Sequence, residues 1–109
     1  MKLRKGDVCF VNLGGVGHEQ SGNRPAIVLA ATRTKIAVVI PVTANTEALR
    51  FVHTLPLRAT MQSGLQRDSV ALLFHIRAID ERRVEKILGR LSPETRAEID
   101  QGLRKLIDL

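Results

Sequence analysis

Most apolar residues of this chain fall in short runs rich in β-branched side chains, and two of the runs alternate with the two-residue period of β-strands. Runs of this kind, bounded by Gly, Pro, Asn and Asp, predict strands at 7–13, 24–31, 35–43, 50–57, 68–79 and 85–91. Polar or glycine-rich loops are predicted between them at 14–23, 44–50 and 58–68. The pattern is typical of an antiparallel sheet of short strands.

Proline positions refine two of these strands. Pro25 lies near the start of one strand, which predicts an edge position or a position where a strand begins. The segment 35–43 is apolar on both faces and is therefore predicted to be largely buried. We expect this strand to end where Pro41 removes a backbone donor.

Alternation within the segment 68–79 assigns its side chains to two faces. A regular strand would place His75 and Arg77 on one face and Phe74 and Ile76 on the other. The two polar side chains would then be available to a ligand on the same side of the sheet.

The C-terminal segment changes to the spacing of a helix. Ser92 is a suitable N-cap, Pro93 fits the first helical position, and Glu94 is favoured by the helix dipole in the first turn. The apolar residues at helical spacing are predicted to face the core: Ile99, Leu103, Leu106 and Ile107. A short helical turn is predicted from Asp80 to Arg83. The predicted fold class is mainly β with a C-terminal helix (α+β), a small antiparallel β-barrel.

Length and composition fit a single domain over residues 1–109. The chain is 44% hydrophobic and 26% charged, which is sufficient for a core and argues against disorder. Its longest apolar run, 36–42, is too short to span a bilayer, and no apolar stretch follows the basic N-terminus. We expect a cytoplasmic protein without a membrane partner. The single cysteine, Cys9, lies in an apolar run and is predicted to be a buried free thiol.

The charge of the chain favours an anionic partner such as RNA or DNA. Seventeen basic residues against eleven acidic ones give a net charge of +6. Because the chain has three Phe and no Trp or Tyr, little material is expected for a base-stacking platform. Phosphate and base-edge contacts are therefore expected to carry most of the binding, with base readout by the loops 44–50 and 58–68.

Two common kinds of site are disfavoured by the motifs. The glycines of the loop 14–23 lack the Gly-Lys-Ser/Thr of a P-loop and the helix of a dinucleotide fingerprint. The three histidines, His18, His53 and His75, show no i, i+4 pair and no cysteine partners, so no metal site is predicted. We expect no cofactor.

A third kind of chemistry, acid–base cleavage of a phosphodiester, fits the residues better. Attack by a 2′-hydroxyl requires a proton acceptor, a proton donor and groups that offset charge on phosphorus. His18 and Glu19 can exchange protons near neutral pH, Arg24 offers a planar fork to phosphate oxygens, and Thr43 offers a hydroxyl donor. Taken one at a time, these residues are better explained as a loop ion pair between Glu19 and Arg24 and a turn residue at Thr43.

A family resemblance runs over nearly the whole chain. The blocks RKGDVCFVNL, GHEQSGNRPAIVL, VVIPVT, IRAIDERRV and GRLSPET resemble, in order and spacing, the MazF/PemK/Kid family of type II toxins. The most specific of them is G-x-E-Q-x-G-x-R-P-A-x-V. The resemblance implies a homodimeric CcdB/MazF-like barrel that cleaves single-stranded RNA at short motifs without a metal, leaving a 2′,3′-cyclic phosphate and a 5′-hydroxyl. It also implies a cognate antitoxin whose acidic tail covers the RNA groove.

The resemblance assigns roles to particular residues. Arg24 and Thr43 match the central catalytic pair of the family, and His18 and Glu19 are further catalytic candidates. Contacts to RNA are expected from four residues: Gln20, Asn23, His75 and Arg77. Arg77 and Asp80 match an Arg-x-Ile-Asp block, where the pair is equally consistent with a brace at a strand end.

The chain departs from the family at one position. Many members carry an acidic residue and a glutamine where this chain has Phe74 and His75. Phe74 cannot transfer a proton, so the base is expected to be His18 or Glu19, with His75 as the alternative. Two other functions stay open: a non-catalytic poison of DNA gyrase like CcdB, disfavoured by the absence of Trp, and a catalytically dead RNA-binding barrel.

Overall fold

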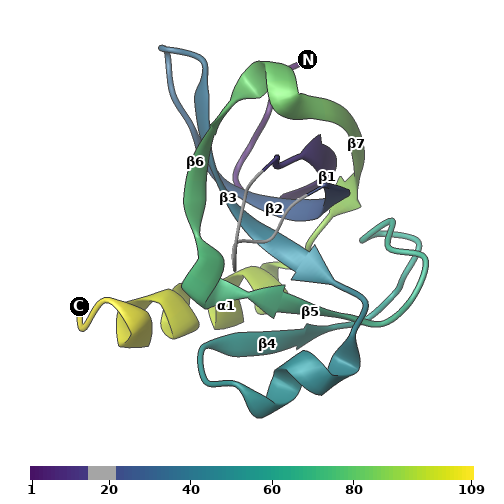
Figure 1. Ribbon diagram of the computed structural model, residues 1–109, viewed down its shortest axis with the longest axis vertical. Helices are drawn as coiled ribbons and strands as arrows, with labels where there is room; N and C mark the ends of the chain where they lie inside the picture. The colour runs from purple at the N-terminus through teal and green to yellow at the C-terminus, as the bar shows by residue number, and fades with distance from the viewer. Residues whose placement is uncertain (15–21) are drawn as a thin grey trace.

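The computed structural model describes residues 1–14 and 22–109, which form a curled antiparallel sheet with a helix beside it (Figure 1). The strands are β1 (Asp7–Asn12), β2 (Asn23–Ala31), β3 (Ile36–Thr43), β4 (Thr54–Leu57), β5 (Ser69–Leu72), β6 (Arg77–Asp80) and β7 (Val84–Arg90). Short 3-10 turns are η1 (Thr46–Arg50), η2 (Leu73–His75) and η3 (Glu81–Arg83). The chain ends in the helix α1 (Pro93–Leu106).

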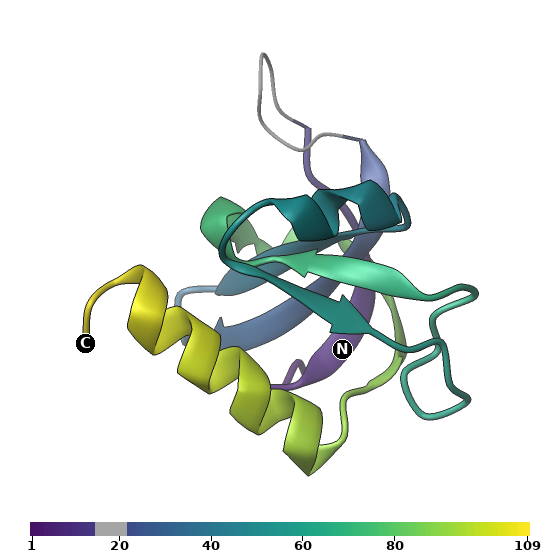
Figure 2. The same cartoon turned by 90° about the horizontal axis from the view of Figure 1, so that it is seen from below.

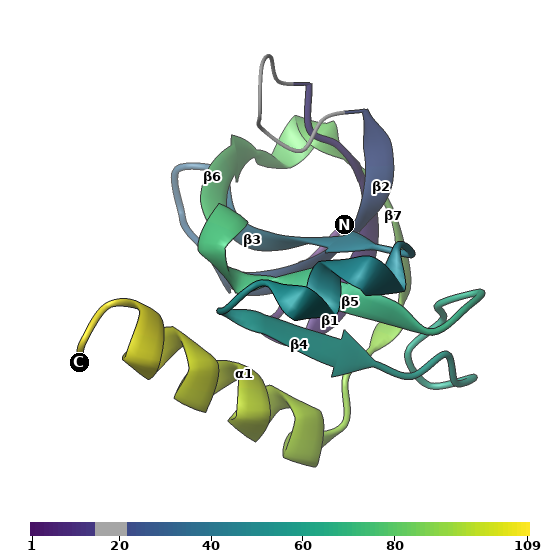
Figure 3. The same ribbon diagram turned by 60° about the horizontal axis from the view of Figure 1, so that its bottom comes forward.

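The strand β3 organises the sheet. The strand order is β4-β5-β3-β2-β1-β7, with every neighbour antiparallel, and β6 also pairs with β3. The first half of β3, Ile36–Val39, pairs with β6, whereas its end, Val42–Thr43, pairs with β5. The sheet therefore divides into two branches along a single strand (Figure 3).

The fold class predicted from the sequence is confirmed, but the closed barrel is not. Among the described residues, no pairing joins β7 to β6 or to β4, so the sheet curls without closing. The chain passes from β6 to β7 through η3, which Asp80 caps by accepting a hydrogen bond from the Arg82 N–H. A tight hairpin that would pair these two strands is replaced by this turn.

Residues on the two faces of β1, β2 and β3 supply two separate cores. Cys9, Ala26 and Val39 are fully buried in the core inside the curl of the sheet. Their neighbours Val8 and Ile27 are buried in the second core, which α1 helps to cover. Because both faces are covered, the prediction of a largely buried strand at 35–43 is confirmed, and its bounds are nearly correct.

The prediction that Pro41 ends its strand is wrong. The strand continues to Thr43, and Pro41 itself is paired with Ala26 of β2. On the other side of β3, the pairing with β6 stops at Val39 and the pairing with β5 starts at Val42. Pro41 lies in the gap between these two partners, where a missing N–H costs little.

Two strands predicted as continuous are shorter than the sequence indicated. In the segment 50–57, β4 includes only the last four residues, and His53 before it has a left-handed backbone with φ of 60°. In the segment 68–79, the 3-10 turn η2 separates β5 from β6. The loop predicted at 44–50 contains the helical turn η1, capped by Asn45.

The helix α1 follows the prediction closely at its start. Ser92 caps it by accepting a hydrogen bond from the Thr95 N–H, and Pro93 is its first residue. Ile99 is buried against the sheet, but Ile107 lies beyond the end of the helix and is 61% exposed, so its predicted place in the buried stripe is wrong. Figure 2 shows α1 lying along the side of the sheet near β4. Within the described ranges, no helix is long and apolar enough to cross a membrane.

Candidate functional site

Arg24 and Thr43 come from neighbouring strands at the same edge of the curled sheet. The antiparallel pairing of β2 with β3 ends at Ala26 and Pro41, and the same register continued by two residues would set Arg24 opposite Thr43. Directly opposed residues of an antiparallel pair have their side chains on one face, about 5 Å apart at Cβ. The sheet therefore places the two residues of the predicted catalytic pair at the same end of neighbouring strands.

The environment of each side chain suits contact with an anion. Arg24 is half-buried, and this loss of solvent lowers the pKa of its guanidinium from the usual value, because desolvation disfavours the charged form. An arginine still stays protonated at neutral pH. The Thr43 Oγ1 accepts a hydrogen bond of 3.2 Å from the Asn45 N–H, so its own proton is left to be donated outward.

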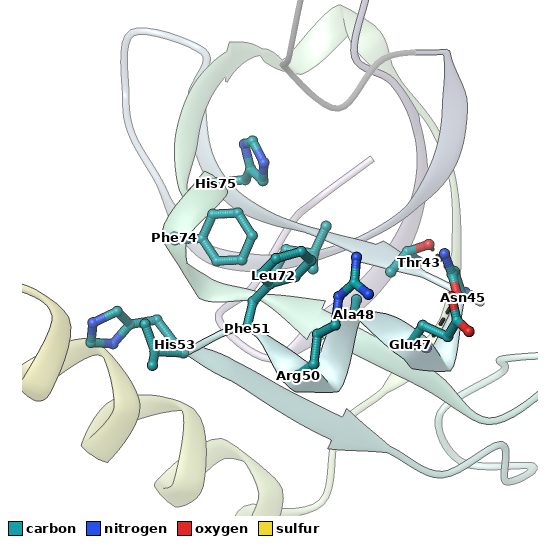
Figure 4. A pocket seen from close by; sticks show the side chains of 11 residues that line it. Thr43, Asn45, Glu47, Ala48, Arg50, Phe51, His53, Leu72, Phe74 and His75 are labelled. Atoms are coloured by element: carbon teal, nitrogen blue, oxygen red, sulfur yellow. Dashed lines mark hydrogen bonds between the residues drawn. The ribbon is translucent and has the colours of Figure 1, made fainter.

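A cavity of about 520 Å³ opens beside Thr43 (Figure 4). Its lining comes from the end of β3, from η1 and the turn after it, from β5 and from η2, which converge although they are distant in sequence. The residues that line it are Thr43, Asn45, Glu47, Ala48, Arg50, Phe51, Val52, His53, Leu72, Phe74 and His75. Both polar and aromatic side chains therefore face one space.

The lining of the cavity shows on which side the residues of η2 lie. Phe74 and His75 both line it, so the prediction that they face opposite sides of a strand is wrong. The reason is local: the 3-10 turn rotates successive side chains by about a third of a turn, not by a half. Arg77 begins β6, pairs with Val39 and is half-buried. Its partner Val39 is four residues before Thr43 on β3, which corresponds to about 13 Å at the usual rise of a strand.

Of the remaining residues predicted from the sequence, the structure describes only Asn23. Asn23 is exposed at the start of β2, where it pairs with Asn12. His18, Glu19 and Gln20 lie outside the described residues. Their predicted roles therefore stay predictions.

Sequence reasoning missed several groups that line the cavity, among them Glu47, Arg50 and Phe51. The loop 44–50 was expected to read bases, but nothing in its sequence singled out these side chains. They meet Thr43 only because η1 folds back beside the end of β3. The loop 58–68 contributes to a second cavity of about 390 Å³, together with Phe10 and Lys86.

Two other predictions concern reactive groups. Cys9 is a fully buried free thiol, as predicted. Its pKa is raised to about 12, mainly because burial disfavours the thiolate and to a lesser extent because of the nearby negative charge of Asp7. Such a thiol is a poor nucleophile. Within residues 1–14 and 22–109, no group of three or more His, Cys, Asp or Glu side chains is arranged to hold a metal ion.

Comparison with known protein families relates this arrangement to toxins. The model of the PemK-like, MazF-like toxins of type II toxin–antitoxin systems matches residues 4–107. The chain belongs to this family. The resemblance seen in the sequence blocks is therefore confirmed, and it extends over nearly the whole chain.

Individual relatives agree with this membership. The chain is similar to Endoribonuclease EndoA of Bacillus subtilis (strain 168), with 32% identity over 95% of this chain and 93% of the relative. Its fold is similar to MazF from Deinococcus radiodurans, with a TM-score of 0.80, 28% identity and 96% of each chain covered. A MazE–MazF structure from the same organism gives a TM-score of 0.73, 25% identity and coverage of 96% and 94%.

Proposed function

We propose that this member of the PemK/MazF family acts as a sequence-specific, metal-independent endoribonuclease toxin on single-stranded RNA. The 2′-hydroxyl of the substrate attacks the adjacent phosphate, giving a 2′,3′-cyclic phosphate and a 5′-hydroxyl. The observation that carries the proposal is the position of Arg24 and Thr43 at the same end of neighbouring strands, with Thr43 lining a cavity of about 520 Å³. The similarity to an enzyme named endoribonuclease supports it.

Arg24 and Thr43 act on the scissile phosphate. The guanidinium of Arg24 clamps two phosphate oxygens and offsets the charge that develops on them, because its planar fork matches their geometry. Its partial desolvation strengthens this attraction, since less water competes for the charge. The Thr43 hydroxyl, which already accepts from Asn45, donates to a phosphate oxygen.

The proton of the 2′-hydroxyl requires a separate acceptor. Arginine cannot serve because it stays protonated in proteins. His18, Glu19 and His75 are the candidate bases, and the presence of His75 in the lining of the cavity supports its candidacy. Gln20, Asn23 and Arg77 are proposed to hold the RNA chain on either side of the cut.

The partners follow from charge and from the relatives. A net charge of +6 favours a polyanion such as RNA. Complex formation between MazE and MazF in a similar structure supports an antitoxin as the second partner, whose acidic tail would compete with RNA for the same cations. We place the toxin in the cytoplasm as a homodimer, as in the family that its sequence resembles.

Cleavage of a long mixed-sequence RNA by the purified protein in EDTA tests the proposal. We expect discrete cuts with cyclic phosphate ends, and we expect Arg24→Ala to reduce the cleavage rate by at least a hundredfold because the phosphate loses its clamp. Mapping the ends identifies the cleavage motif and the terminal chemistry. Arg24→Lys should also be strongly impaired, because a lysine keeps the charge but not the fork.

Arg104→Ala is the matched control, since it removes the same side chain from an exposed position on α1. It should cleave at the rate of the unmodified protein. Sedimentation of each variant shows whether the dimer remains. Cleavage by Arg24→Ala at the original rate would refute the role of Arg24, and a folded dimer that never cuts RNA would refute the nuclease.

A further inference from the structure

The few aromatic residues of this protein are concentrated at the cavity. The chain contains three phenylalanines and no tryptophan or tyrosine. Phe51 and Phe74 both line the cavity, and they keep 51% and 39% of their surface exposed. A phenylalanine that only stabilises a core is usually buried far more completely. Two of the three phenylalanines are thus exposed at one location, which makes aromatic stacking possible there even though the chain has few aromatic residues.

The rings form a connected group. Phe51 and Phe74 make an edge-to-face contact with centroids 6.4 Å apart at 70°. The His75 imidazole lies 4.5 Å from the ring of Phe74, and the Arg50 guanidinium lies 4.9 Å from the centroid of Phe51. Figure 4 shows Phe74 and His75 at one end of the cavity, with Phe51 and Arg50 between them and Thr43.

The backbone holds the two aromatic segments together. The Leu73 N–H donates to the His53 carbonyl over 3.0 Å, which ties the start of η2 to the turn after η1. His53 adopts a left-handed backbone to make this turn, and Leu73 is fully buried beneath it. The positions of Phe51 and Phe74 are thus set by the fold before any ligand arrives.

We propose that Phe74 and Phe51 form a stacking subsite for one unpaired nucleobase of the RNA substrate. The proposal rests on the nuclease function proposed above and names how the same cavity holds its substrate. The base stacks on an exposed aromatic ring, while the phosphate attached to its nucleotide approaches Arg50 or continues toward Thr43.

Chemistry and size favour a nucleobase as the occupant. The cavity combines aromatic faces with a cation at Arg50 and hydrogen-bonding groups at Asn45 and Thr43, which match a flat heterocycle carrying a phosphate. Its volume of about 520 Å³ lies within the usual range for small-molecule sites. Stacking alone tolerates every base, so discrimination between bases would come from the neighbouring polar groups, Asn45 and Glu47.

The experiment combines protein variants with RNA that lacks single bases. The probe is an RNA oligonucleotide containing the mapped cleavage motif, with a 2′-deoxynucleotide at the cut site to prevent cleavage. A series of such oligonucleotides carries one abasic nucleotide at each position in turn. Their affinities are measured for the unmodified protein, for Phe74→Ala and for Phe74→Trp, with sedimentation of each variant.

We expect one position at which removal of the base weakens binding to the unmodified protein by about 5- to 150-fold. At that position Phe74→Ala should lose most of the preference for intact over abasic RNA, because one of the two rings of the subsite is missing. Phe74→Trp should keep the preference for the intact base. Since the chain has no other tryptophan, its fluorescence should be quenched by the intact RNA and not by the abasic one.

Several results would overturn the subsite. If removal of each base lowers the affinity of Phe74→Ala as much as that of the unmodified protein, no base stacks on Phe74. A Phe74→Ala protein that dissociates into monomers, with unchanged discrimination against abasic RNA, would assign the aromatic group to contact with a second copy. Failure of the proposed function differs from both, since the unmodified protein would then neither bind nor cleave RNA.

Discussion

At the scale of single residues, burial decides which reactive groups take part in chemistry. Arg24 is partly desolvated near the start of β2, where its charge can still meet a ligand, and the register of β2 and β3 places it at the strand end that carries Thr43. Cys9 lies on the neighbouring strand β1, but its side chain has no exposed surface. The sequence could identify both residues, yet only their depth in the structure separates a candidate site from an inert group.

The Cys9 thiol should therefore be protected in the folded protein. With its pKa raised to about 12 by burial, the native thiolate fraction at pH 8 is on the order of 10³-fold below that of the unfolded chain. Above about pH 9 the unfolded thiol loses its proton while the folded one keeps it, so stability should fall as pH rises toward 12.

A thiol reagent at pH 8, added with and without urea, measures the protection. Denaturation curves between pH 8 and 11 measure the stability, and Cys9→Ala should remove the part of the alkaline decline that comes from the thiol. Equal labelling rates with and without urea would contradict the burial of this side chain.

At the scale of elements, the predicted strand and helix bounds are correct where they depend on neighbouring residues. They are wrong where distant segments of the chain contact each other. The capped start of α1 and the bounds of β1 and β7 follow from nearby residues. The breaks at 51–53 and at η2 do not, and there the Leu73 N–H donates to the His53 carbonyl, a contact between segments 20 positions apart in the chain. A two-residue period continues through both breaks and hides them.

Gly89 shows how closely β7 approaches the segment 58–68. A Cβ atom at this position would collide with the backbone of Gln62 and Ser63, where the Arg90 N–H donates to the Gln62 carbonyl over 2.7 Å. We expect Gly89→Ala to lower the free energy of unfolding by about 1–3 kcal/mol, because backbone atoms must move to admit a methyl group.

Urea denaturation compares this variant with Glu85→Ala, which changes an exposed residue of the same strand. The control should shift stability by less than about 0.5 kcal/mol. If both variants have the same stability as the unmodified protein, the close approach at Gly89 is absent in solution.

At the scale of the whole molecule, β1 joins the two ends of the chain. Asp7 is buried, accepts from the Arg4 N–H over 2.8 Å and pairs with Arg90 over 2.9 Å, 83 positions away. Beside this contact, the Leu91 N–H donates to the Gly6 carbonyl. The candidate site lies on the sheet that this connection completes.

We expect Asp7→Asn to destabilise the whole fold by about 1–3 kcal/mol, because a charged acceptor of hydrogen bonds is lost from a buried position. The partly exposed Arg90 side chain keeps the cost below that of a fully buried pair. Thermal or urea unfolding measures the effect.

Asp100→Asn is the control for this variant, since Asp100 pairs with Lys5 at the surface over 3.0 Å. It should cost less than about 1 kcal/mol. A loss as large as that of Asp7→Asn would show that burial does not govern the strength of these pairs.

The sequence by itself determined the fold class, the family and the helix with its cap, and it singled out Arg24 and Thr43 as the candidate catalytic pair. These features can be recognised from local periodicity, from capping residues and from a contiguous motif, all of which involve neighbouring positions. The base among His18, Glu19 and His75 was narrowed to three candidates in the same way.

Only the tertiary structure decided which distant residues share one space. It placed Arg24 and Thr43 at the same end of neighbouring strands, folded η1 beside the end of β3, and gathered Phe51 and Phe74 at one cavity. It also left the sheet open where a barrel was expected. The physical reason is that register, strand breaks and cavity walls arise from contacts between segments far apart in the chain, and such contacts leave no periodic trace in either segment.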